Sequence, residues 1–245
     1  AHCELMRHCE PGMYEYQLAS LFSHHCQMNG AAHLAYSSIV GGGSNACVLH
    51  YVENSHVLIQ GDLVLIDAGC EVECYASDIT RTFPVGGRFS AAQRALYEVV
   101  LEAQLAAIAK VRAGNHWNDP HQAAARALTK GLLKLGLLRG TLAKALKTQS
   151  YARFFMHRTG HWLGMDVHDV GDYKIDGHWR ELEPGMVLTV EPGLYIPRGA
   201  KGVAKKWQGI GIRIEDDVLV TRGEPDVLTR DVPKSVEQIE ALMAR

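Results

Sequence analysis

Apolar residues recur at helical spacing in five stretches of the chain. Helices are predicted over residues 1–30 with a break at 11–12, and over residues 90–110, 119–136, 141–151 and 235–245. The pattern over 90–110 is the strongest, and Ser90 is its candidate N-cap. The sequence therefore predicts two long amphipathic helices in the middle of the chain and shorter helices at both ends.

Short apolar runs of strand length fill much of the rest. Strands are predicted over residues 37–40, 46–51, 62–83, 186–196 and 209–221. A tight glycine loop over 41–43 separates the first two, and it lacks the Lys-Ser/Thr pair of a phosphate-binding loop. Strands, then helices, then strands again indicate an α+β fold with a central antiparallel sheet.

Two of the predicted strands repeat one pattern. GDLVLIDAG over residues 61–69 aligns with GMVLTVEPG over 185–193, and each ends an apolar run with an acid, one residue and a glycine. Asp67 and Glu191 occupy equivalent positions in the two copies. A match this short also arises by chance, but an acid at the end of a buried strand is unexpected in both places.

Four carboxylates fall in apolar strand settings, where an unpaired charge is costly. Asp67 follows four apolar residues, and a hairpin over 67–83 would bring Asp78 opposite it. Glu191 ends a second apolar strand, and Glu215 shares one face of a third strand with Arg213 while isoleucines take the other face. Each acid alone could be a strand-end surface residue or a salt-bridge partner, but all four together favour a shared site.

Composition narrows the function classes. The chain has 245 residues, of which 47% are hydrophobic, and this suits one large domain or two closely packed halves. The formal charge of −2 disfavours a nucleic-acid partner. No apolar run is long enough for a membrane helix, and the charged N-terminus does not resemble a signal peptide. The six irregularly spaced cysteines indicate free thiols, most of them small buried side chains, in a reducing cytoplasm. Because the chain starts without Met and inside a helical pattern, we expect it to be a fragment of a longer protein.

Three histidines crowd into FMHRTGHWLGMDVHDVG at His157, His161 and His168. They could bind a metal, carry protons or fill a core, and the last is the commonest reading for isolated histidines. Four like charges packed together cannot all ionise uncompensated, whereas two divalent cations would balance them. Such a pair activates water, and an oxygen-rich donor set with one imidazole suits Mn(II), Co(II) or Fe(II).

These residues and the stretches around them resemble one family closely. The set Asp67, Asp78, His161, Glu191 and Glu215 has the order and approximate spacing of the pita-bread metallopeptidases of family M24. Six stretches resemble its Xaa-Pro aminopeptidase (aminopeptidase P) branch: SIVGGGSNACVLHY, GDLVLIDAGCE, DITRTFPVGGRFS, FMHRTGHWLGMDVHDVG, TVEPGLYI and GIRIEDDVLVT. The resemblance covers essentially the whole chain.

The resemblance implies a pseudo-twofold α+β pita-bread fold, with a curved antiparallel sheet covered by helices, over residues 1–245. It also implies two divalent ions, usually manganese, and a peptide substrate with proline in second position. Asp67 and Asp78 would bind one ion and His161 and Glu191 the other, with Asp78 and Glu215 bridging both.

The family pattern assigns further roles. Glu191 is the candidate general base, and His50, His157 and His168 match histidines that contact substrate, stabilise the tetrahedral intermediate or shuttle protons. Arg213 and Tyr195 match an arginine and a tyrosine near the metals. Full-length members carry a preceding creatinase-like domain that can complete the cleft and a homo-oligomer.

One residue departs from the pattern, and several related activities compete. Arg158 stands where the family prefers glycine, so we expect an altered cleft beside His157. Prolidase has the same ligands but cuts only Xaa-Pro dipeptides, whereas methionine aminopeptidase fits poorly around residues 157–171. A non-catalytic binding module or a metal-free creatinase-like enzyme is disfavoured because all five ligands are present.

Overall fold

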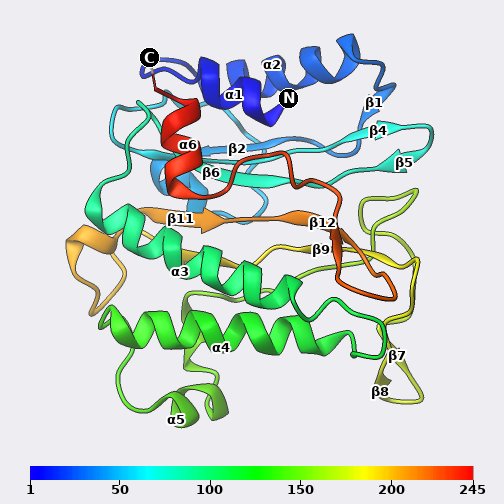
Figure 1. Cartoon of the computed structure of the whole chain (residues 1–245). Coiled ribbons are helices and arrows are strands. Elements are labelled where there is room, and N and C mark those ends of the chain that lie inside the picture. The colour runs from blue at the N-terminus through cyan, green and yellow to red at the C-terminus, as the bar shows by residue number, and fades with distance from the viewer. Residues whose placement is uncertain (245) are drawn as a thin grey trace.

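The computed structural model describes residues 1–244. Its α-helices are α1 (His2–His8), α2 (Glu15–Met28), α3 (Ala91–Ile108), α4 (Asn118–Lys134), α5 (Leu142–Lys147) and α6 (Val236–Leu242). Three 3₁₀ turns are η1 (Gly43–Cys47), η2 (Ser150–Arg153) and η3 (Lys205–Trp207). In Figure 1 most strands lie between α1 and α2 above and α3 and α4 below, while α6 crosses from α1 toward α3, which it also contacts. No helix within residues 1–244 combines the length and apolarity that crossing a bilayer requires.

The strands pair only in antiparallel fashion within the described residues. They are β1 (His33–Leu34), β2 (Ile39–Gly42), β3 (Leu63–Asp67), β4 (Cys70–Val72), β5 (Tyr75–Ala76), β6 (Thr80–Pro84), β7 (Lys174–Ile175), β8 (His178–Trp179), β9 (Val187–Val190), β10 (Gly193–Ile196), β11 (Ile210–Arg213), β12 (Asp216–Leu219) and β13 (Asp226–Val227). Hydrogen bonding divides them into β2-β3-β6, β13-β12-β9, β10-β11, β1-β4-β5 and β7-β8. The strand-rich centre is thus built from short paired units, as the α+β prediction expected, but not from one continuous ladder.

The two sequence repeats fold alike. The backbone N–H of Gly61 donates to the Val85 carbonyl, and the N–H of Gly185 donates to the Val220 carbonyl. Both glycines have positive φ, 89° and 96°, which explains why glycine starts each copy. Each copy then continues as a buried strand, β3 or β9, that delivers its acid to the same region. The internal repeat is therefore structural.

The predicted helices are confirmed with small shifts of their ends. The Ser90 hydroxyl accepts the N–H of Gln93, and the Gln93 side chain accepts the N–H of Ser90, which closes a capping box at the start of α3. Helices α3 and α4 pack closely, because a Cβ on Gly131 would lie 2.3 Å from the Val99 Cγ1. This pair covers one side of the strands (Figure 1).

Two local predictions are wrong. Residues 46–51 form no strand, because the chain turns through η1, where the buried Glu15 carboxylate holds the Gly42 N–H and the Asn45 amide. Only two of the six cysteines, Cys9 and Cys26, are buried, although no disulfide joins any of them within residues 1–244.

Candidate metal centre

Strand pairing places the first two acids together. In the β3–β6 ladder Asp67 is opposite Thr80, so Asp78, two residues earlier, comes near the end of β3. The small β4-β5 hairpin fills the connection. The Tyr36 hydroxyl touches both carboxylates and lies 2.5 Å from the Asp67 Oδ1. The predicted hairpin over 67–83 is confirmed, and Tyr36 is a neighbour that the sequence did not indicate.

A second backbone pairing brings His161 to Glu191. The N–H of Thr189 donates to the His161 carbonyl at 3.0 Å, and the N–H of Glu191 donates to the Thr159 carbonyl at 2.8 Å. Gly160 permits this approach, because a Cβ there would lie 2.0 Å from the Thr189 carbonyl oxygen. The glycine before the histidine is therefore a steric requirement of the site.

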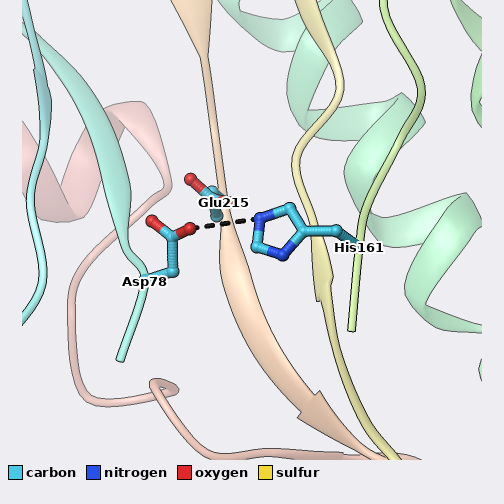
Figure 2. Close-up of side chains that lie close together, drawn as sticks. All are labelled: Asp78, His161 and Glu215. Carbon is cyan, nitrogen blue, oxygen red and sulfur yellow. Dashed lines mark ion pairs between the residues drawn. The ribbon is translucent and has the colours of Figure 1, made fainter. Parts of the chain in front are cut away.

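Glu215 enters between strands β11 and β12. Its N–H donates to the Thr80 carbonyl at 3.0 Å, and the Thr80 hydroxyl donates to its Oε2 at 2.6 Å. The side chain is 1% exposed, so a buried carboxylate is held by a strand that lies 135 residues away in the sequence. Figure 2 shows Glu215 directed toward Asp78 and His161.

These side chains converge on a cavity of about 270 Å³, lined by all five predicted ligands and by His50, His157, His168 and Arg213. Among the described residues, one ligand atom each of Asp78, His161 and Glu215 lies within 4.8 Å of the others. The His161 Nε2 lies 3.2 Å from the Asp78 Oδ2, the contact dashed in Figure 2, and 4.0 Å from the Glu191 Oε1. Asp67 and Glu191 thus border a tighter group of three.

The electrostatics are those of crowded acids. Burial and the Asp67 charge raise the pKa of Asp78 to about 6, and burial raises the pKa of Glu191 to about 8. Burial, Asp78 and Glu191 together raise the pKa of Glu215 well above its usual range. Burial alone would lower the pKa of His161, but the hydrogen bond to Asp78 and the Glu191 charge outweigh it and raise that pKa to about 9. Without a cation to compensate their charge, these four side chains retain protons to higher pH than usual.

Arg213 supplies a charge that the sequence argument did not count. Its Nη2 donates to the Asp67 Oδ2 at 2.6 Å, and its side chain is 4% exposed. Burial would raise the pKa of Asp67, but Arg213 and the Tyr36 hydroxyl outweigh it and lower that pKa. The predicted balance of four carboxylates by two divalent cations therefore left out the positive charge of a buried guanidinium. It also left out the acid Asp217, whose Oδ2 accepts the Asp78 N–H and whose pKa is raised by burial to about 8.

A hydrogen-bonded chain orients His157. Arg213 Nη1 donates to the Tyr195 hydroxyl at 3.0 Å, and that hydroxyl lies 2.8 Å from the His157 Nε2. The His157 Nδ1 lies 2.7 Å from the Arg158 carbonyl, so Nδ1 carries the proton and Tyr195 donates to Nε2. Burial lowers the pKa of His157 to about 4, which keeps this ring neutral. Both ring nitrogens already have protein partners, so a contact with substrate requires one of them to be released.

The two remaining histidines lie at the rim. His168 is exposed, and its ring centroid is 4.2 Å from that of His161 in an edge-on arrangement. His50 is also exposed and lies on the loop after η1, rather than in the strand that the sequence predicted. Both line the cavity from its solvent side.

The residues fit a metal centre. The His161 Nδ1 lies 2.9 Å from the Trp162 carbonyl, which leaves Nε2 facing the acids, as metal-binding imidazoles require. The other donors are carboxylate oxygens, and the pKa values of Asp78, Glu191 and Glu215 are raised because no protein cation fully compensates these three acids. An oxygen-rich set with one nitrogen suits a hard or borderline divalent ion.

Metal-free protein is expected to lose stability from about pH 7 to about pH 9. The pKa values of Glu191 and Asp217, about 8, and of His161, about 9, lie above their ordinary values, so their contribution is present at low pH and is lost as pH rises through these values. Added Mn(II) should reduce the loss, because a cation binds the ionised carboxylates and the neutral imidazole. Calorimetric melting temperatures of chelated and Mn(II)-loaded protein across this range test this expectation. A metal-free melting temperature that is constant or rises would contradict it.

Comparison with known proteins places this arrangement in a family. The sequence profile of metallopeptidase family M24 matches residues 1–222. The chain is 49% identical to the Xaa-Pro aminopeptidase of Escherichia coli K12 over 243 residues, which cover 99% of this chain and 55% of that protein. It is 40% identical to the human Xaa-Pro dipeptidase over 277 aligned residues, which cover 100% of this chain and 56% of that protein.

Solved structures of bacterial aminopeptidases have the same fold as this chain. The Pseudomonas aeruginosa aminopeptidase PepP superposes with a TM-score of 0.98 at 56% identity, over 99% of this chain and 55% of that one. An E. coli aminopeptidase P variant in complex with substrate superposes with a TM-score of 0.96 at 48% identity, over 99% of this chain and 55% of that one. The chain spans little more than half the length of these relatives. With its profile match, this structural likeness and its cluster of buried acids around His161, the chain belongs to metallopeptidase family M24 and has the α+β pita-bread fold.

Proposed function

We propose that this chain hydrolyses the first peptide bond of peptides with proline in second position. The observation that carries the proposal is the convergence of Asp78, His161 and Glu215 on one cavity, with Asp67 and Glu191 at its border. The likeness to Xaa-Pro aminopeptidases over 99% of the chain supports the substrate class. Residues 1–245 would act as one catalytic domain, which corresponds to 55% of the length of the E. coli relative.

The cofactor would be two divalent ions, for which we propose Mn(II). Asp67 and Asp78 would hold one ion, His161 and Glu191 the other, and Asp78 and Glu215 would bridge them. When bound, such a pair activates a water molecule and polarises the scissile carbonyl. Metal binding must displace the protons that Asp78, Glu191 and His161 retain in its absence.

Glu191 is our candidate general base. Its carboxylate is 19% exposed, so it can reach an incoming water, and bound metal would keep it ionised, as a general base must be. The His157 Nδ1 lies 3.7 Å from the Glu191 Oε2, but its proton is directed to the Arg158 carbonyl, so the Glu191 carboxylate stays free to accept a proton. Glu191 would accept a proton from the attacking water and relay it to the leaving nitrogen.

The surrounding residues would orient the substrate. Arg213 and Tyr195 hold the His157 ring in place, and Arg213 also neutralises Asp67. The exposed His50 and His168 line the cavity, and we propose that they donate to the substrate carbonyl as negative charge develops on its oxygen.

Product analysis tests the proposal. The protein is stripped with chelator, Mn(II) is restored, and an Xaa-Pro-Xaa tripeptide is offered beside an Xaa-Pro dipeptide. We expect mass spectrometry to show release of the first residue from the tripeptide, only with metal, because the carboxylate cluster requires a cation to function. Metal-loaded protein that cleaves neither peptide would contradict the proposed activity of this chain.

The second candidate is prolidase activity, which the 40% identity to the human Xaa-Pro dipeptidase favours. The same experiment separates the two, because a prolidase cleaves the dipeptide and leaves the tripeptide intact. Cleavage of the dipeptide alone would move the assignment to prolidase.

A further inference from the structure

Arg158 lies where the candidate metal cavity meets a larger one. It lines the cavity of about 270 Å³ that the five proposed metal ligands also line, and it lines a neighbouring cavity of about 870 Å³. A third, very small cavity lined by Arg158 shares Gly160 with the first and His121 with the second. A peptide that leaves the metal cavity toward the larger one must therefore pass this guanidinium.

The guanidinium is oriented but has no counter-charge. Its Nη2 donates to the Asn118 Oδ1 at 2.5 Å, and its Cζ lies 5.0 Å from the centroid of the Trp179 ring. Arg158 is exposed, and no carboxylate within residues 1–244 forms an ion pair with it. Because a guanidinium carries five N–H donors in a fixed fork, this side chain keeps donors available for a planar anion.

The larger cavity has an excess of positive charge. Lys110, Arg126 and Arg158 line it, against a single acid, Asp119. The Asp119 carboxylate already accepts a hydrogen bond of 2.8 Å from the His116 N–H, next to the start of helix α4. Burial lowers the pKa of His121 to about 4, so this histidine adds no charge near neutral pH. A cavity lined in this way favours an anionic ligand.

We propose that Arg158 is a specificity-determining residue that binds a carboxylate of the peptide on the C-terminal side of the scissile bond. The inference rests on the proposed function, because only cleavage at the first peptide bond leaves most of the substrate on that side. The larger cavity has the volume of an ordinary ligand site and can hold residues beyond the proline. The carboxylate has two sources, the C-terminus of a short peptide or an acidic side chain after the proline.

Matched peptides distinguish these sources on Mn(II)-loaded protein. One arm compares Ala-Pro-Ala as free acid with its C-terminal amide, and the other compares Ala-Pro-Glu amide with Ala-Pro-Gln amide. In each arm we measure the ratio of kcat/KM for the charged peptide to that for the neutral one. We expect a ratio of about fivefold to tenfold in at least one arm, the usual effect of one charge-assisted hydrogen-bonded pair at a partly exposed site.

Substitution of Arg158 then tests the assignment. Arg158→Gln should bring the ratio to about one, because the amide keeps polarity but loses the charge and the fork. The ratio within each protein cancels any general change in activity. The matched control is Arg153→Gln, which removes a nearby exposed positive charge that lies over Phe154 and lines neither cavity. If Arg158→Gln melts at a lower temperature, Arg158→Lys gives a second reading, with an expected intermediate ratio.

The outcomes are distinct. A ratio that collapses in Arg158→Gln and persists in Arg153→Gln supports the inference, and the responding arm identifies the carboxylate. A wild-type ratio near one in both arms overturns it, and so does a ratio that Arg158→Gln leaves unchanged. Failure to cleave any of the four peptides overturns the proposed function itself, and the inference with it.

Discussion

Replacing His161 by alanine is expected to lower kcat/KM for an Xaa-Pro-Xaa peptide by roughly a thousandfold or more. The Nε2 of this ring lies 3.2 Å from the Asp78 Oδ2 and is the only nitrogen donor in the three-residue cluster of the described chain. Losing about 4 kcal/mol of the transition-state stabilisation that a bound cation supplies corresponds to that factor. Glu191→Ala should have a comparable effect, because it removes both a proposed ligand and the proposed base.

Two measurements separate this loss from unfolding. Metal content by elemental analysis should fall in His161→Ala, while the far-ultraviolet circular dichroism should stay unchanged. The matched control is His178→Ala, which removes an exposed histidine from the β7-β8 hairpin, away from the metal cavity. A His161→Ala protein with near wild-type turnover would show that the dinuclear assignment is wrong.

Asp216→Ala is expected to destabilise the fold by about 3–5 kcal/mol, the usual cost of leaving one partner of a buried ion pair uncompensated. Its carboxylate and the Arg81 guanidinium are both 0% exposed and lie 2.7 Å apart. The same carboxylate accepts from Thr229, Gln104 and Lys234, at 2.6 to 2.7 Å. Burial alone would raise the pKa of Asp216, but Arg81 and Lys234 outweigh it and keep that pKa below its ordinary value.

Urea unfolding of chelated protein measures this effect without a contribution from bound metal. Arg81→Met combined with Asp216→Ala should recover part of the loss, because the unpaired buried charge is then gone. The exposed pair Arg88–Glu240, in which the Arg88 side chain is 75% exposed, is the control, and Arg88→Ala should cost about 1 kcal/mol or less. A loss in Asp216→Ala as small as that of the control would contradict a structural role for the buried pair.

The sequence predicted the features that depend on neighbours along the chain. Helical periodicity and the Ser90 cap located α3, because capping involves residues three apart. The acids Asp67 and Glu191 stood out because each ends an apolar strand, and the repeat around them proved to have matching glycine turns. Where a local pattern misled, over residues 46–51, a buried carboxylate from α2 held the backbone in another conformation.

The partners of these residues were not readable from the chain. Arg213 reaches Asp67 across 146 residues, and Arg81 reaches Asp216 across 135. Tyr36 touches both Asp67 and Asp78, yet no periodicity marks it. Such contacts depend on how strands from distant parts of the chain come together, and a single sequence carries no local signal for that.

The α+β class, the family resemblance and the candidate acids and histidines could be predicted from the sequence alone, because residue type and strand ends are local properties. The three-dimensional contacts were needed to see that a buried Arg213 compensates Asp67 and that Tyr195 and the Arg158 carbonyl occupy both nitrogens of His157. They were also needed to see that Arg158 stands between two cavities. The physical reason is that charge compensation, tautomer and cavity shape are set by atoms that meet in space, whatever their separation in the sequence.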